Sequence, residues 1–177
     1  MTKRKIITVQ DLSSESGAFI QEMQSISNTS AALLAAAFID ASLDVLLRAF
    51  LVNDRKKVDA LLGAQRALDS LGSRATLAFC LGLISQELYS DIDTIRKIRN
   101  EFAHSRLALG FGDQPINDWC KNLFLGNKCL ASFIEQGRDV NSADIFIHTV
   151  SMIVTQIITR GLEQQHRAEG IPFKWIE

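Results

Sequence analysis

The run from Ala31 to Val52, AALLAAAFIDASLDVLLRAFLV, decides the fold class of this chain. It is long and apolar enough to cross a membrane as a helix, yet it contains Asp40, Asp44 and Arg48 at four-residue intervals. On a helix this spacing places the three side chains on one narrow polar stripe. Because ionisable groups near the middle of a membrane span are costly, we expect a helix buried in a protein core and not a membrane helix.

The sequence on both sides of this run also has the pattern of helices. No stretch alternates apolar and polar residues as a half-buried strand does, and no Asn-Gly or Asp-Gly hairpin turn is present. From Gln86 to about His104, apolar residues recur on one face, and Asn141 opens a final long helix that ends near Gly170. The shorter predicted helices cover residues 14–26, 54–62, 64–71, 73–84, 118–124 and 129–134.

These elements predict one all-α domain, a single helical bundle with interrupted helices. We place this domain at residues 14–170, between a flexible N-terminus at residues 1–13 and a C-terminal tail at residues 171–177. No internal repeat and no linker divides it. A chain of 177 residues, of which 47% are hydrophobic and 22% charged, can bury such a core without disulfides or metal.

The charge balance and the cysteines limit the functions to consider. With 19 Lys+Arg against 20 Asp+Glu, the formal net charge of −1 gives no long-range field to attract a polyanion. Cys80, Cys120 and Cys129 form no CxxC pair and stand among apolar residues, which predicts reduced thiols in the core of a cytosolic protein. The basic N-terminus lacks the apolar run of a signal peptide. We therefore expect a cytoplasmic protein.

One residue breaks the pattern of the predicted helix at 86–104. Arg99 falls inside the apolar stripe, and a guanidinium that cannot lose its charge needs acceptors or an opening to solvent there. We expect Asp40 and Asp44 to be its buried polar partners, because the helix that carries them is otherwise buried all round. The alternative is that these two carboxylates and Arg48 form only the solvent-facing stripe of that helix.

Asn100 and His104, together with Arg99, form a candidate catalytic group. They stand at i and i+4, so their side chains share one face of the helix. Histidine titrates near neutral pH, and arginine binds phosphate through two parallel hydrogen bonds. Arg99, Asn100 and His104 could therefore cleave RNA without metal, with His104 as the general acid or base. Alternatively, Arg99 is an ion-paired core residue and His104 a cation near a helix C-terminus.

No other motif in the chain predicts a cofactor or a metal. The three histidines are scattered and have no metal-ligand spacing, and no CxxC or HExxH motif is present. The sequence also lacks a glycine-rich phosphate loop and a GxSxG nucleophile elbow. We therefore expect neither a bound metal nor a cofactor.

Two family resemblances involve these residues. The segment IRKIRNEFAH at 95–104 resembles the Arg-x4-His signature of the HEPN superfamily of all-α domains. A longer stretch resembles the mannitol operon repressor (MltR-like) family. The residues that carry this second resemblance are the apolar helix from about Ala32, Leu71-Gly72, Arg74, Leu81-Gly-Leu-Ile84, Tyr89, Asp91, Arg99 and His104.

The two resemblances imply different functions. The mannitol operon repressor family implies non-enzymatic control of a sugar-alcohol operon. Catalytic HEPN proteins are metal-independent endoribonucleases, often toxins or defence effectors, that act as dimers, and Arg99 and His104 occupy the matching positions here. Their substrate implies RNA as the partner of this chain.

The composition argues against a repressor that contacts its operator directly. The chain has no helix-turn-helix with a basic recognition helix, and its charge gives little affinity for phosphate. We therefore predict a cytoplasmic transcriptional regulator that binds a protein partner, with no direct DNA binding and no membrane contact. The family and the apolar excess also favour a homodimer. The alternative is a metal-independent endoribonuclease that uses Arg99, Asn100 and His104.

Overall fold

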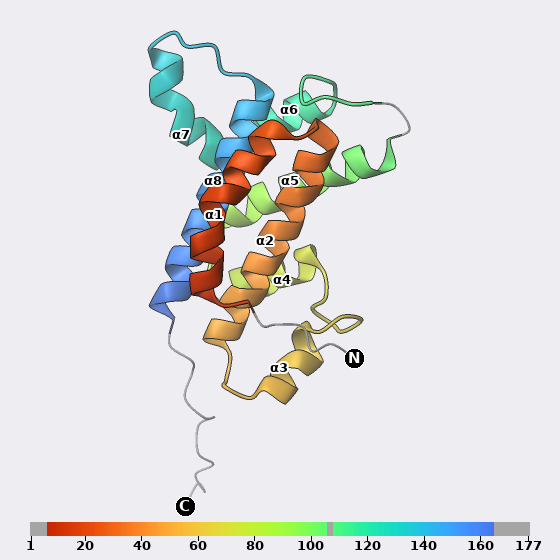
Figure 1. Ribbon diagram of the computed structural model, residues 1–177, viewed down its shortest axis with the longest axis vertical. Helices are drawn as coiled ribbons and strands as arrows, with labels where there is room; N and C mark the ends of the chain where they lie inside the picture. Colours follow the sequence, from red (N-terminus) through yellow and green to blue (C-terminus); the bar gives the residue numbers. More distant parts are fainter. Residues whose placement is uncertain (1–6, 106–107, 165–177) are drawn as a thin grey trace, which may run out of the picture.

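The computed structural model describes residues 7–105 and 108–164, and this part of the chain folds into eight α-helices and no strand. The predicted all-α bundle is confirmed (Figure 1). The helices are α1 (Val9–Ser25), α2 (Asn28–Phe50), α3 (Arg55–Leu62), α4 (Leu71–Cys80), α5 (Gln86–His104), α6 (Ile116–Lys121), α7 (Phe124–Glu135) and α8 (Ser142–Glu163).

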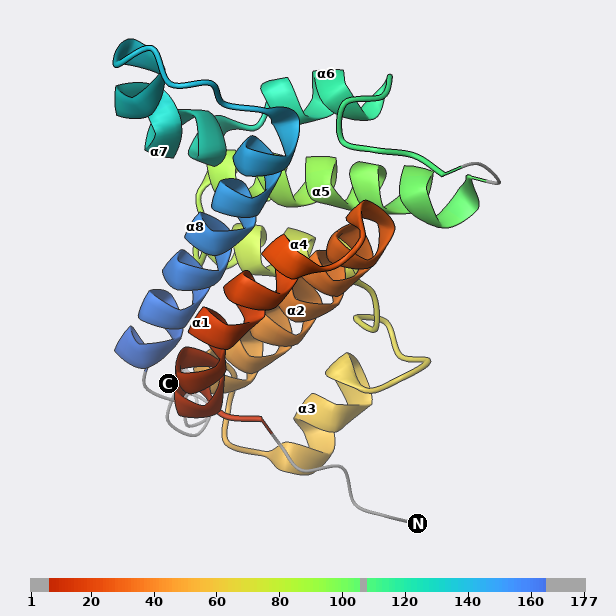
Figure 2. The ribbon, with the colours of Figure 1, turned by 45° about the horizontal axis from the view of Figure 1, so that its top comes forward.

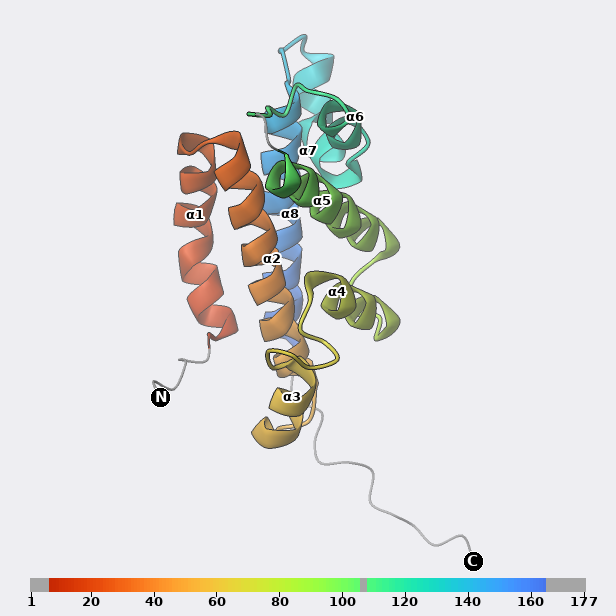
Figure 3. The same cartoon turned by 90° about the vertical axis from the view of Figure 1, so that its right-hand side faces the viewer.

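Helix α2 lies at the centre of the bundle. It packs against α1, α4, α5 and α8, and Figure 3 shows it between α1 on one side and α4 and α5 on the other. Its side chains at Ala32, Ala35, Ile39, Leu43 and Leu46 have no exposed surface. By length and composition α2 and α8 would each pass for a membrane span, but about half of each is buried inside the bundle. The apolar run therefore supplies the core, as the sequence predicts.

Helix α1 begins earlier than the sequence analysis places it. Thr8 is the N-cap, and its hydroxyl accepts from the N–H of Asp11 while the Asp11 carboxylate accepts from the N–H of Thr8. This reciprocal pair satisfies two N–H groups that a helix start otherwise leaves free. The chain is thus helical from Val9, although the prediction makes residues 1–13 flexible. Residues 1–6 and the predicted tail at 171–177 lie outside the described residues.

The predicted helix at 64–71 is wrong. Residues 64–70 form turns, in which Gln65 has a φ of 60° and its N–H donates to the Asp69 carboxylate at 3.0 Å. Helix α4 begins at Leu71, where the Ser70 hydroxyl accepts from the N–H of Ser73. It ends at Cys80, because Gly82 follows with a φ of 70°, a conformation that continues no right-handed helix.

The second half of the chain follows the predicted order. Helix α5 has the predicted bounds and runs across α2 and α8 (Figure 2). Helices α6 and α7 stay separate, and Asn141 caps α8 through the N–H of Asp144. Helix α7 packs closely on α8 at Gly126, whose missing side chain leaves room for Thr149 and Ile145.

The prediction of three core thiols is partly wrong. Cys120 is completely buried, but Cys80 and Cys129 are exposed, and all three are free. Cys80 is the last residue of α4, Cys129 lies within α7, and both are open to solvent. Burial raises the pKa of the Cys120 thiol to about 12, because the apolar surroundings disfavour the thiolate.

Candidate functional site

The predicted burial of Arg99 is wrong. Its side chain is exposed, and its Nη1 donates to Oδ1 of Asn100 at 2.9 Å. Arg99 does fall at the predicted angle of the α5 stripe, but the facing surface of α2 presents Ala36 and Ala37. Two such small side chains do not cover it, and the stripe opens to solvent at this point.

The opening is a hollow of about 510 Å³, which we call the Arg99 pocket. Three parts of the chain form its walls: α2, the start of α4 with the preceding turn, and α5. The residues that line it are Leu33, Ala36, Ala37, Asp40, Asp69, Ser70, Leu71, Gly72, Arg96, Arg99 and Asn100. Of the three predicted catalytic residues, the structure therefore brings Arg99 and Asn100 into one pocket.

His104 is not part of this pocket. It is the last residue of α5, it is exposed, and it lies five residues beyond Arg99, about 140° further around the helix axis. The two side chains thus leave the axis of α5 in different directions. The catalytic role of the three residues stays a prediction.

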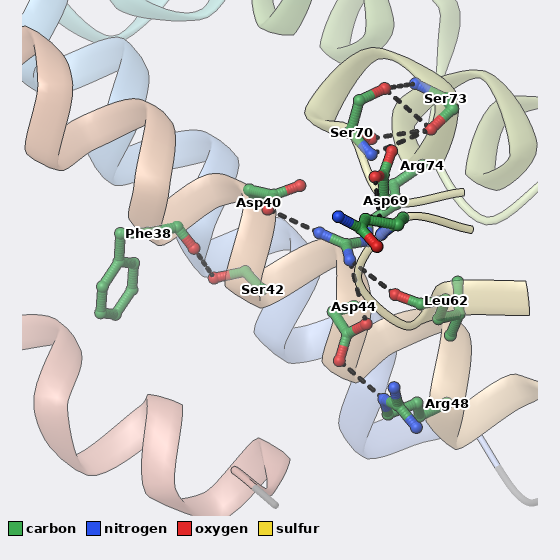
Figure 4. Close-up of polar contacts among 11 residues, drawn as sticks. Phe38, Asp40, Ser42, Asp44, Arg48, Leu62, Asp69, Ser70, Ser73 and Arg74 are labelled. Atoms are coloured by element: carbon green, nitrogen blue, oxygen red, sulfur yellow. Dashed lines mark hydrogen bonds and ion pairs between the residues drawn. The ribbon is translucent and has the colours of Figure 1, made fainter. Parts of the chain in front are cut away.

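The buried arginine of this fold is Arg74. Its Nη1 lies 2.5 Å from Oδ2 of Asp40, its Nη2 donates to the carbonyl oxygen of Leu62 at 2.9 Å, and Nη2 also lies 3.6 Å from Asp44 (Figure 4). Asp40 and Asp44 are thus partners of a buried arginine, but that arginine is Arg74 from α4 and not the predicted Arg99 from α5. Sequence reasoning missed it although Arg74 also breaks an apolar stripe, the one that buries Ala75 and Ala78.

Arg48 extends this ion-pair network to α3. Its Nε donates to Asp44 and its Nη1 donates to Asp59, both at 2.7 Å. Burial opposes the charge of Arg48, but the hydrogen bonds to the two carboxylates outweigh burial and raise its pKa. The polar stripe of α2 therefore fastens α3 and α4 to the core helix. It is neither a solvent stripe nor a support for Arg99.

Asp91 is a second buried charge that sequence reasoning did not place. Its side chain is 2% exposed, and its two carboxylate oxygens accept from the N–H groups of Phe124 and Leu125 at 2.9 and 2.8 Å. Burial raises the pKa of Asp91, and the two hydrogen bonds act in the opposite direction. The start of α7 has no side-chain cap of its own, because its N-cap residue is Leu123. Asp91 of α5 supplies that cap from another helix.

The described residues contain no metal centre. Between residues 7 and 105 and between 108 and 164, no three His, Cys, Asp or Glu side chains come together in a way that could hold a metal ion.

Comparison with known proteins gives the family. The model of the family described as mannitol repressor matches residues 18–167, which is most of the chain. The protein therefore belongs to the mannitol repressor family. No curated protein matches the sequence. The HEPN resemblance stays a prediction.

Two solved structures have a similar fold. The MtlR chain of the MtlR–HPr complex from Escherichia coli superposes with a TM-score of 0.65 at 17% identity, over 81% of this chain and 98% of that one. A possible transcriptional regulator, YggD from Shigella flexneri 2a str. 2457T, gives a TM-score of 0.61 at 16% identity, over 84% of this chain and 96% of that one. At these identities the likeness shows the fold.

Proposed function

We propose that this protein is a cytoplasmic transcriptional regulator that controls a sugar-alcohol operon by binding a protein partner. Membership of the mannitol repressor family supports a regulator. The observation that carries the partner is that this chain matches 98% of a chain from the solved MtlR–HPr complex, with a TM-score of 0.65. We take a protein of the HPr type as the first partner to test.

The distribution of charge supports a protein partner over direct contact with DNA. Binding to DNA depends on free cationic side chains that neutralise phosphates. In the described part of the chain, seven of the thirteen lysines and arginines lie within 4 Å of a carboxylate. They are Arg48, Arg55, Lys57, Arg74, Arg96, Lys97 and Arg160. Because these seven cations are already paired with carboxylates, they add little non-specific affinity for DNA.

Exposed apolar groups on α7 support an interface. Phe124 is 47% exposed and Ile134 is 49% exposed, and a cation stands over each of two aromatic rings: Lys128 over Phe124 and Arg138 over Phe133. Large exposed apolar side chains in a group favour contact with another protein. The same surface fits the homodimer that we predict, and light scattering during size-exclusion chromatography tests that prediction.

The proposed function is tested by titrating the purified protein with purified HPr from the same organism in a calorimeter. We expect a defined stoichiometry with HPr and no retardation of an operator fragment in a gel without it. The Phe124→Ser variant, compared with the control Leu33→Ser on α2, where Leu33 is 38% exposed, locates the interface on α7. Tight binding of the operator by the protein alone would contradict the proposal.

A second candidate function is metal-independent cleavage of RNA. It is favoured by one observation: the exposed Arg99 has no carboxylate within 4 Å among the described residues and hydrogen-bonds only to Asn100. Because His104 lies outside the pocket, the reaction would need the histidine of a second copy. Incubation of mixed single-stranded RNA in EDTA with the wild type and with His104→Ala tests this. Cutting that the variant loses would make the protein an enzyme.

A further inference from the structure

One end of the Arg99 pocket is cationic. Arg96 and Arg99 lie one turn apart on α5, and both line the pocket. Arg96 donates hydrogen bonds from Nε at 3.1 Å and from Nη2 at 2.7 Å to Oδ1 of Asp93. This ion pair fixes the guanidinium and does not involve its Nη1. Oδ1 of Asn100 accepts one hydrogen bond from Nη1 of Arg99. The remaining guanidinium donors of both arginines are available, and arginine is the side chain best shaped to bind phosphate.

The opposite wall adds backbone donors. Leu71 and Gly72 are the first two residues of α4, a helix of ten residues, and both line the pocket. The first N–H groups of a helix have no partner within the helix, and the Ser70 cap is hydrogen-bonded to the N–H of Ser73 and not to those two. Gly72 brings no side chain to this wall, and a Cβ at this position would lie 3.8 Å from Cδ and 3.9 Å from Nε of Arg96, so the start of α4 lies close to that arginine. A helix start and two arginines thus face one hollow.

The rest of the pocket suits hydroxyl groups. Asp69 is exposed, and only its Oδ2 is occupied, by the N–H of Gln65 at 3.0 Å. Asp40 also lies in the wall, with its Oδ2 engaged by Arg74. Carboxylates accept hydrogen bonds from neutral hydroxyls but repel a polyanion. The volume of about 510 Å³ lies within the range of small-molecule sites.

We propose that the Arg99 pocket binds a small phosphate monoester that carries hydroxyl groups. The phosphate lies between Arg96, Arg99 and the first N–H groups of α4, and the hydroxyl-bearing part extends towards Asp69. A nucleic acid fits less well, because its neighbouring phosphates would meet Asp69 and Asp93. The site is independent of the contact with a protein partner, so either proposal can fail without the other.

The test is calorimetric titration of the full chain with glycerol 3-phosphate, inorganic phosphate and glycerol. We expect glycerol 3-phosphate to bind most tightly, inorganic phosphate more weakly, and glycerol not at all. Arg99→Gln should weaken binding by about tenfold or more, since it removes the charge that bonds the phosphate. Arg160→Gln is the matched control, because Arg160 is also exposed but pairs with Glu163 on α8; its affinity should equal that of the wild type.

A second variant tests the pocket by shape instead of charge. Ala37 is exposed and lines the pocket, so Ala37→Phe should fill the hollow and abolish binding while leaving the thermal unfolding midpoint nearly unchanged. The proposal is overturned if neither phosphate compound binds at millimolar concentration, or if Arg99→Gln binds as tightly as the wild type. It is also overturned if single-stranded RNA binds and glycerol 3-phosphate does not displace it.

Discussion

Arg74 and Asp40 are the buried ion pair that joins α4 to α2, with Nη1 and Oδ2 only 2.5 Å apart. The arginine side chain is 10% exposed and the aspartate side chain 31%. The two residues are 34 positions apart in the chain, so the pair closes a long loop that contains α3. The free energy of unfolding should therefore depend on Arg74 and not on Arg99.

The first prediction compares these two arginines. Arg74→Met leaves the carboxylates of Asp40 and Asp44 near the core without their cation, and we expect it to lower the free energy of unfolding by about 3 kcal/mol. Arg99→Met, on an exposed position, should change it by no more than about 0.5 kcal/mol. Urea denaturation followed by circular dichroism measures both. Equal effects of the two substitutions would contradict the assignment of the buried ion pair.

The second prediction concerns the cap that Asp91 provides. Asp91→Ala leaves two buried N–H groups at the start of α7 without an acceptor, and we expect a loss of about 2 to 4 kcal/mol in the free energy of unfolding. Asp93→Ala is the control on the same helix. It breaks only the half-exposed ion pairs with Arg96 and Lys97, which are worth at most about 1 kcal/mol.

Hydrogen exchange distinguishes this cap from a general loss of stability. We compare the exchange rate of the amide protons of Phe124 and Leu125 with that of the amide protons of α2. The difference between the two rates should be larger in Asp91→Ala than in the wild type. If α7 keeps its protection while α2 loses it, the cap is not what holds α7 in place.

The third prediction concerns the reactivity of the thiols. Cys80 and Cys129 are exposed and Cys120 is completely buried. In the native protein a thiol reagent should therefore modify two cysteines rapidly and the third only after addition of denaturant. Mass spectrometry of the modified peptides identifies each site. Rapid modification of Cys120 in the native state would show that its neighbourhood opens readily.

The fourth prediction is a pH dependence that follows from the same thiol. The folded pKa of Cys120 is about 12, above an unfolded value of about 8.5. The folded state therefore holds the proton more tightly, so this contribution is fully present below about pH 8.5 and is lost as the pH rises towards 12. At pH 10 the wild type should have lost on the order of 2 kcal/mol of stability through this group. Cys120→Ala should lack that part of the decline, and an identical pH profile would exclude the thiol as its cause.

The fifth prediction compares two helical glycines. A Cβ at Gly126 would overlap Thr149 and the backbone of Ile145 on α8, whereas a Cβ at Gly17 meets nothing within 4 Å. Gly126→Ala should therefore cost about 1 to 3 kcal/mol through overpacking. Gly17→Ala, inside α1, should add about 0.5 to 1 kcal/mol through helix propensity. The thermal unfolding midpoints should move in opposite directions, and a shift of both in one direction would contradict the packing of α7 on α8.

The fold was predictable where sequence neighbours decide the structure. The stripe of α5, the helix predicted at 54–62 and the start of α8 after Asn141 depend on local signals, and the structure has each of these elements. The turns at 64–71 were not predictable from apolar spacing, because the bond from the N–H of Gln65 to Asp69 replaces a helical turn.

The sites were harder to predict, because they depend on which helices meet. The spacing of Asp40 and Asp44 predicts partners for a buried arginine, but two arginines break apolar stripes, and only the packing of α4 on α2 selects Arg74. In the same way, Asp91 is one of the two aspartates on α5, and only the packing of α7 against α5 distinguishes it from Asp93. The Arg99 pocket exists because α2 presents alanines opposite α5.

Asp40 and Asp69 line the Arg99 pocket and also a second hollow, of about 630 Å³, on the other side of the turns at 64–71. The two hollows therefore share a wall, and that wall includes one partner of the Arg74 ion pair. A molecule that binds in one hollow and shifts Asp40 or Asp69 therefore also changes the charge that lines the other hollow. Binding on the two sides would then be coupled, by the same factor in both directions.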